Sequence, residues 1–298
     1  MDLRIDEPAA VARWLPRGVA VLAAALGGLG LILWVAANWA QFGRFGRFAL
    51  LEATLLVMAS GAAFLPRARV PLGLVALLAI GGLLAYFGQT YQTGADPWQL
   101  FALWAALSVP LALSLRSDVV WAPWVLVAMS AITLWVHAHA GHGWNLHSSD
   151  LPVHLAGWTT AWALAAALGE PTRRFTGAGI WSFRAALSFA AWLVTLTALA
   201  ALFGQRIAPH FAAGIVTLAL AAAGLASRRF FDLFGLSAVA LGLNALVVGG
   251  LARWLLDDLR DGEFVLPLLL LGLVAAALLA ATVHGVMRIA RARSGASR

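Results

Sequence analysis

Long apolar runs separated by short polar segments dominate the chain from residue 18 onward. Most of these runs are about 18 to 23 residues long, and a helix of about 20 residues spans the hydrocarbon core of a bilayer. Because buried helices of soluble proteins are usually shorter, the pattern predicts transmembrane helices. Read between charged residues and Pro or Gly breaks, the expected spans are residues 18–40, 48–65, 70–91, 98–115, 119–138, 151–168, 182–204, 208–226, 233–252 and 264–286.

Composition supports this interpretation. The 298 residues are 62% hydrophobic and only 11% charged, too few charged side chains to cover a water-soluble globule of this size. We therefore expect an all-α fold, a polytopic transmembrane helix bundle of about ten spans. The chain is expected to form a single integral membrane domain over residues 1–298, with a cytoplasmic interfacial N-terminus at 1–17, the bundle at 18–286 and a basic cytoplasmic tail at 287–298.

The distribution of positive charge predicts how the chain is inserted. All 20 basic residues are arginines, and with both termini in the cytoplasm only Arg44, Arg47, Arg206, Arg253 and Arg260 lie on the outer side. The other fifteen lie inside, as the positive-inside rule requires. The first apolar run is too long for a cleavable signal peptide, so it is expected to be retained. We expect a multi-pass protein of a bacterial inner (plasma) membrane, N-in and C-in.

Two missing residue types exclude whole reaction classes. Without cysteine the chain cannot supply a thiolate nucleophile, an iron–sulfur cluster or a cysteine zinc site. Without lysine it has no phosphate-binding loop of a nucleotide hydrolase and no Schiff-base cofactor. The net charge of +7 is spread over short loops, which does not indicate nucleic acid. We expect no cofactor, and as partners membrane lipids or another membrane protein.

Short motifs between Leu29 and Pro110 carry a family resemblance. They are Gly30, Ala36-Ala37-Asn38-Trp39, Arg47, Gly88-Gln89 with Tyr91, and Trp98, Leu100, Phe101, Trp104 and Pro110. With these residues the first 120 or so positions resemble the bacterial predicted-membrane-protein family named domain of unknown function 2157. The resemblance implies a multi-span envelope protein and no particular reaction.

The polar residues of these motifs gather on the predicted outer face. They lie at the end of the first span, at the end of the third and at the start of the fourth: Asn38, Trp39, Gln89, Tyr91, Asp96 and Trp98. Amides and a phenol can bind a polar ligand through hydrogen bonds while tryptophan offers a stacking surface, so these six are candidate ligand-binding residues. The alternative is that they tie neighbouring helix ends together.

Ionisable residues offer two further candidates. Glu52 lies inside the second span, where a carboxylate can act as a proton carrier or general acid, or can be held as an anion by its own helix. His137, His139, His142 and His154, with His147, surround the loop after the fifth span, and Asp150 lies one helical turn before His154. Imidazoles in this number can bind a metal, although a solvated, variable loop is the favoured interpretation.

These observations favour a transport-like or accessory protein that binds a small polar or lipid-linked envelope compound at its periplasmic face. A membrane-embedded enzyme acting on an envelope lipid or glycan is the alternative, with Glu52, Asp96 or the pair Asp150 and His154 as acid or base. A structural partner of another membrane protein is the third reading. Tryptophans near span ends, among them Trp121 and Trp124, are expected to be interfacial anchors.

Overall fold

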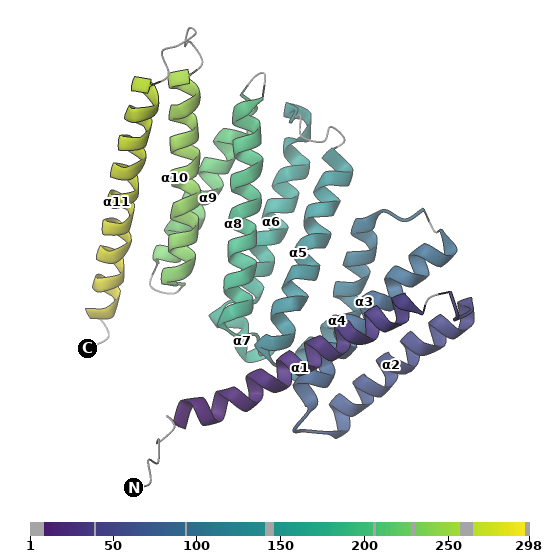
Figure 1. Ribbon diagram of the computed structural model, residues 1–298. Helices are drawn as coiled ribbons and strands as arrows, with labels where there is room; N and C mark the ends of the chain where they lie inside the picture. The colour runs from purple at the N-terminus through teal and green to yellow at the C-terminus, as the bar shows by residue number, and fades with distance from the viewer. Residues whose placement is uncertain are drawn as a thin grey trace. The chain divides into compact units, whose positions relative to one another are not determined.

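The computed structural model describes residues 9–38, 40–92, 94–140, 146–204, 207–227, 230–256 and 265–295. Within these ranges every regular element is a helix (Figure 1). The elements are α1 (Ala9–Ala37), α2 (Arg44–Phe64), α3 (Arg69–Tyr91), α4 (Pro97–Leu115), α5 (Asp118–Ala140), the 3-10 turn η1 (Ser148–Asp150), α6 (Leu151–Ala167), α7 (Glu170–Thr176), α8 (Ile180–Phe203), α9 (His210–Ala226), α10 (Leu233–Leu256) and α11 (Val265–Gly295).

Each of the ten predicted spans coincides with one of these helices. Among the described residues, eight helices are long and apolar enough to cross a membrane, namely α1 to α5, α8, α10 and α11. The segment η1–α6 and the short α7 form a bent pair at an angle of 71°, and α9 is a shorter apolar helix. The all-α polytopic bundle is therefore confirmed, while the cytoplasmic position of the two termini stays a prediction.

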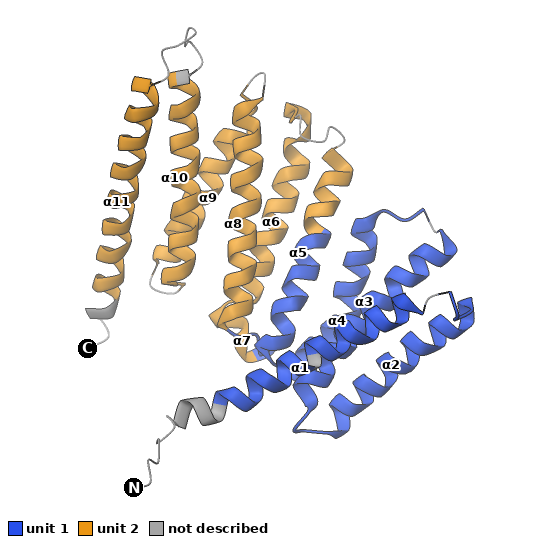
Figure 2. Cartoon of the chain, viewed as in Figure 1, with its two compact units in different colours: residues 1–131, 175–179 blue, residues 132–174, 180–298 orange. Residues whose placement is uncertain are grey.

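The helices group into two compact units, coloured separately in Figure 2. Unit 1 comprises residues 1–131 and 175–179, and unit 2 comprises residues 132–174 and 180–298. Unit 1 thus contains α1 to α4 and the first half of α5, whereas unit 2 contains the second half of α5 and the helices from η1 onward, apart from the last residues of α7.

In unit 1, α3 packs between α2 and α4. Its contact with α4 depends on Gly81, because a Cβ atom there would come within 2.4 Å of the Trp104 ring. The indole Nε1 of Trp104 donates a hydrogen bond of 2.9 Å to the main-chain oxygen of Leu77. A small residue on one helix thus admits a large ring from the next, which is the role that small residues have between membrane helices.

Two tryptophans differ from the predicted interfacial anchors. Trp121 and Trp124 at the start of α5 are buried, 3% and 7% exposed. The Trp124 indole donates to the main-chain oxygen of Ala105 on α4, and the Trp121 indole donates to that of Thr176. They are packing residues of unit 1, because an indole N–H away from water needs an acceptor and a neighbouring carbonyl supplies it.

In unit 2, α8 is the central helix and packs against α6, α9 and α10. Its buried face is made mostly of small side chains, including Ala190, Val194 and Ala198. A Cβ atom at Gly214 of α9 would lie 2.6 Å from the Cβ of Ala198, so these two helices also approach closely. Farther along the chain, Thr282 of α11 donates a hydrogen bond to the Asn244 side chain of α10.

Gly81→Ala is expected to destabilise the protein, because the added methyl group overlaps the Trp104 ring. Overpacking of this kind costs about 1–3 kcal/mol, so thermal unfolding in detergent should begin several degrees lower. Gly82→Ala is the matched control, since a Cβ there meets Leu51 at an ordinary 3.8 Å. Equal unfolding temperatures for the two variants would contradict this packing.

The predicted topology can be tested by labelling single introduced cysteines, because the natural chain has none. Arg67→Cys and Ala95→Cys lie in the loops before and after α3, on opposite sides of the membrane in the predicted topology. A membrane-impermeant maleimide should label position 95 in spheroplasts and position 67 only after the membrane is broken. The reverse labelling would overturn the orientation.

Candidate functional site

An open groove of about 560 Å³ lies at the junction of α3 and α4 in unit 1. Four polar residues and several apolar ones line it. The polar ones are Gln89, Gln92, Asp96 and Gln99, and the main apolar ones are Leu84, Phe87, Leu100 and Leu103. We call this hollow the Gln89 groove. It includes Gln89 and Asp96, two of the six residues that the sequence singled out.

Local backbone conformation brings the two helix ends together. Gln92 follows the last residue of α3 in a left-handed conformation with φ of 43°, and Gly94 has φ of 62°. Glycine adopts this region without steric cost, which lets the chain reverse within a few residues. Asp96 is extended, and Pro97 then starts α4 with its fixed φ.

The polar side chains of the groove are not engaged elsewhere in the described structure. No hydrogen bond or ion pair between described residues uses the side chains of Gln89, Gln92, Asp96 or Gln99, and all four are exposed. Asp96 occupies the N-cap position of α4 without a side-chain capping bond. Three amides and a carboxylate therefore remain available to a ligand beside an apolar wall.

Gln89 also lines a second hollow, of about 460 Å³. Gln89 lines it together with Val35 of α1, Leu51 of α2 and Tyr86 of α3. The remaining lining is apolar apart from Tyr86, whose hydroxyl donates a 3.3 Å hydrogen bond to the main-chain oxygen of Arg44. Gln89 thus lies between a polar groove and a nearly apolar one.

The other predicted ligand residues lie outside the Gln89 groove. The Asn38 amide donates to the main-chain oxygen of Trp34 in its own helix, at 2.9 Å. Tyr91 packs against Phe87 with the two rings tilted and their centres 4.7 Å apart, and of these two residues only Phe87 lines the groove. Trp98 is half-buried in the first turn of α4, and Trp39 lies outside the described residues.

Tyr86 is the residue that sequence reasoning missed here. It is 5% exposed, and its hydroxyl connects α3 to the start of α2 through Arg44. Tyr91, which the sequence favoured, is instead 48% exposed, with the Arg44 guanidinium 5.7 Å from its ring centre. Both tyrosines lie near the end of α3. They differ in that Tyr86 is buried, with its hydroxyl bonded to the start of α2, whereas Tyr91 is exposed.

Glu52 is exposed on α2 and lines neither hollow. Among the described residues it has no ion pair and no side-chain hydrogen bond. No hydrogen bond or ion pair between described residues joins its carboxylate to Arg44, Arg47 or Gln89, the polar residues nearest to it in the predicted topology. Among the described residues, the structure thus shows no group bonded to Glu52 with which it could share a proton.

The predicted histidines do not form one cluster in the described part of the chain. His137 and His139 are exposed on α5, where the His139 ring stacks on Trp135 at 4.7 Å. His142 lies outside the described residues, and no group of three or more potential metal ligands occurs among those that are described. His147 precedes η1, and its main-chain N–H donates to the Asp150 carboxylate at 3.3 Å.

His154 instead pairs with His210, a residue that the sequence did not single out. The Nδ1 atom of His154 lies 3.0 Å from the main-chain oxygen of Asp150 and 3.2 Å from Nε2 of His210. Both rings are buried, and they meet almost at right angles. The two positions are 56 residues apart, so no local pattern reveals this contact.

The histidine pair predicts a coupled loss of stability. Since only one N–H can lie between the two ring nitrogens, His154→Ala and His210→Ala each remove the same hydrogen bond. At neutral pH the double variant should therefore lose about 0.5–1.5 kcal/mol less unfolding free energy than the sum of the two single variants. Chemical unfolding of the two single variants and the double variant measures this coupling, and strict additivity would contradict the bond.

Comparisons with known proteins identify a family over the first part of the chain. Residues 4–121 match the family model described as "Predicted membrane protein (DUF2157)". This confirms the resemblance carried by the motifs, and the matched segment lies within unit 1. No curated protein and no solved structure matches the chain. The match and the apolar helices together identify a multi-pass membrane protein.

Proposed function

We propose that this membrane protein binds a small polar or lipid-linked envelope compound in the Gln89 groove, in a transport-like or accessory role at the periplasmic face of the inner membrane. One observation carries the proposal. Gln89 and Asp96, on either side of the turn between α3 and α4, line the same hollow together with Gln92 and Gln99. Amides and a carboxylate that meet in one place can recognise hydroxyl and amine groups of a ligand.

The position and composition of the groove support this chemistry. Its apolar wall, including Leu100 and Leu103, can cover an acyl or isoprenoid segment while the polar side chains contact a head group. Pockets of about 300–1,000 Å³ with a few polar groups are typical of small-molecule sites. The distribution of arginines supports an outward-facing position.

The test compares what co-purifies with variants of α4. Leu103→Trp should fill the groove and reduce the amount of bound envelope compound at least tenfold, measured by native mass spectrometry of protein released from nanodiscs. Leu107→Trp is the control, because Leu107 is one turn away, is similarly exposed at 53% against 48%, and does not line the groove. Gln89→Leu should weaken binding severalfold by removing the amide.

Three results would argue against the proposal. Equal occupancy in the Leu103→Trp and Leu107→Trp proteins would place the bound compound elsewhere. Turnover of the compound that stops in Asp96→Asn would favour the enzyme alternative. Loss of a co-purifying membrane protein in Gln89→Leu, with no change in small molecules, would favour the structural role.

A further inference from the structure

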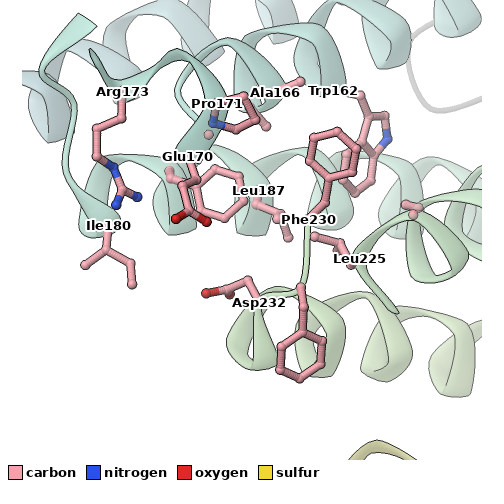
Figure 3. Close-up of a pocket in the computed structure, with 16 residues that line it drawn as sticks. Trp162, Ala166, Glu170, Pro171, Arg173, Ile180, Leu187, Leu225, Phe230 and Asp232 are labelled. Atoms are coloured by element: carbon pink, nitrogen blue, oxygen red, sulfur yellow. The ribbon is translucent and has the colours of Figure 1, made fainter. Parts of the chain in front are cut away.

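Unit 2 contains a separate pocket of about 490 Å³, shown in Figure 3. It lies where α6 ends and α7 begins, and α8, α9 and the residues that lead into α10 complete its walls. The chain bends by 71° between α6 and α7, and Glu170 and Arg173 of α7 both line the pocket. We call this hollow the Trp162 pocket. It lies outside the segment that matches the family model.

The pocket is amphiphilic. Its walls consist largely of apolar side chains, including Trp162, Leu187, Leu225 and Phe230. Its charged lining residues are Glu170, Arg173 and Asp232. In Figure 3 these charged groups lie toward one side, and the rings of Trp162 and Phe230 lie toward the other. A molecule that fits both parts needs an apolar tail and a polar head.

The charged groups are not equivalent. Asp232 accepts hydrogen bonds from the Arg184 guanidinium at 3.1 Å and from the main-chain N–H of Gly235 at 2.7 Å. It is therefore already neutralised within the protein. Glu170 is exposed, so water and salt screen its charge. Arg173 is half-buried and has no ion pair among the described residues.

Two buried donors in the pocket lack an acceptor. The Nε atom of Arg173 and the Nε1 atom of Trp162 are both shielded from solvent, and neither has a hydrogen-bond partner within the described part of the chain. Leaving a buried donor unpaired is costly, and the cost is larger for a charged group. A ligand that supplies negatively charged oxygen atoms would satisfy the guanidinium, whereas the Trp162 indole, on the other side of the pocket in Figure 3, contributes its ring to the apolar wall.

We infer that the Trp162 pocket binds a single-chain amphiphile with an oxyanion head, a carboxylate or a phosphate, whose head pairs with Arg173 and whose tail packs against Trp162, Leu187 and Phe230. A guanidinium recognises either oxyanion through paired, charge-assisted hydrogen bonds. The apolar walls select for the tail, since burying it removes its surface from water. This site is independent of the Gln89 groove, which offers neutral amides and a carboxylate but no arginine.

Binding can be measured with defined probes. The full chain is placed in phosphatidylcholine nanodiscs and titrated with tritiated dodecyl phosphate, and empty nanodiscs correct for partitioning into lipid. Unlabelled dodecanoate, dodecyltrimethylammonium and inorganic phosphate are then used as competitors. We expect dodecanoate to compete within about tenfold of dodecyl phosphate, and the other two to compete at least a hundredfold more weakly.

Matched variants connect the binding to the pocket. Arg173→Gln should weaken dodecyl phosphate binding at least tenfold, whereas Arg174→Gln, an exposed neighbour outside the pocket, should leave it unchanged. Glu170→Gln should strengthen binding about twofold. Gly224→Leu should abolish it without disturbing the fold, because a Cβ at Gly224 meets no atom within 4 Å. Ala223→Leu, exposed and outside the pocket, is its control.

The pattern of losses decides the inference. It stands if the Arg173 and Gly224 variants lose binding and their two controls retain it. Equal weakening by Arg173→Gln and Arg174→Gln would mean that the probe is attracted to the basic surface of the protein in general, and this result would overturn the inference. Unchanged binding in Gly224→Leu, or competition by dodecyltrimethylammonium as strong as that by dodecanoate, would overturn it as well. Inorganic phosphate as effective as dodecyl phosphate would indicate an anion site with no role for the tail.

Discussion

A polar group within the hydrocarbon of a bilayer has no water to bond with, and this constraint governs the structure of the protein. Helices satisfy their own main chains, and few polar contacts remain between them. Those in unit 1 are made largely by side-chain donors bonding to main-chain oxygens, as Trp104 bonds to Leu77 and Trp124 to Ala105. Small residues such as Gly81 allow the approach that these bonds need.

The same constraint explains why both candidate sites lie at helix ends. A helix that ends or bends leaves main-chain and side-chain groups without regular partners. At the turn from α3 to α4 this produces a groove with three amides and the carboxylate of Asp96. At the bend between α6 and α7 it produces a pocket with the guanidinium of Arg173 and the indole of Trp162. The two hollows therefore differ in charge, and we expect them to bind different ligands.

The transmembrane helices could be predicted from the sequence because the pattern that identifies each of them lies within one short segment. A run of about 20 apolar residues identifies a span without knowledge of its neighbours, and all ten expected spans are helices, although only eight of the described helices are long and apolar enough to cross a membrane unbroken. The sequence also predicted that Gln89 and Asp96 lie on the same face, because consecutive spans return to it, and the structure has both residues lining one hollow. It could not distinguish Tyr86 from Tyr91 or pair His154 with His210, since those contacts depend on which helices pack together. Trp121 and Trp124 were assigned to the interface for the same reason, and they are buried.

Lipid contact is the most direct test of the account, because α11 is highly apolar and the protein buries little of it. Leu273 on α11 is 61% exposed, and a cysteine placed there in the otherwise cysteine-free chain can carry a nitroxide spin label. In nanodiscs, collisions with dissolved oxygen should be frequent and collisions with a water-soluble nickel chelate rare. Frequent collisions with the chelate at this position would show that water, and not lipid, covers the helix.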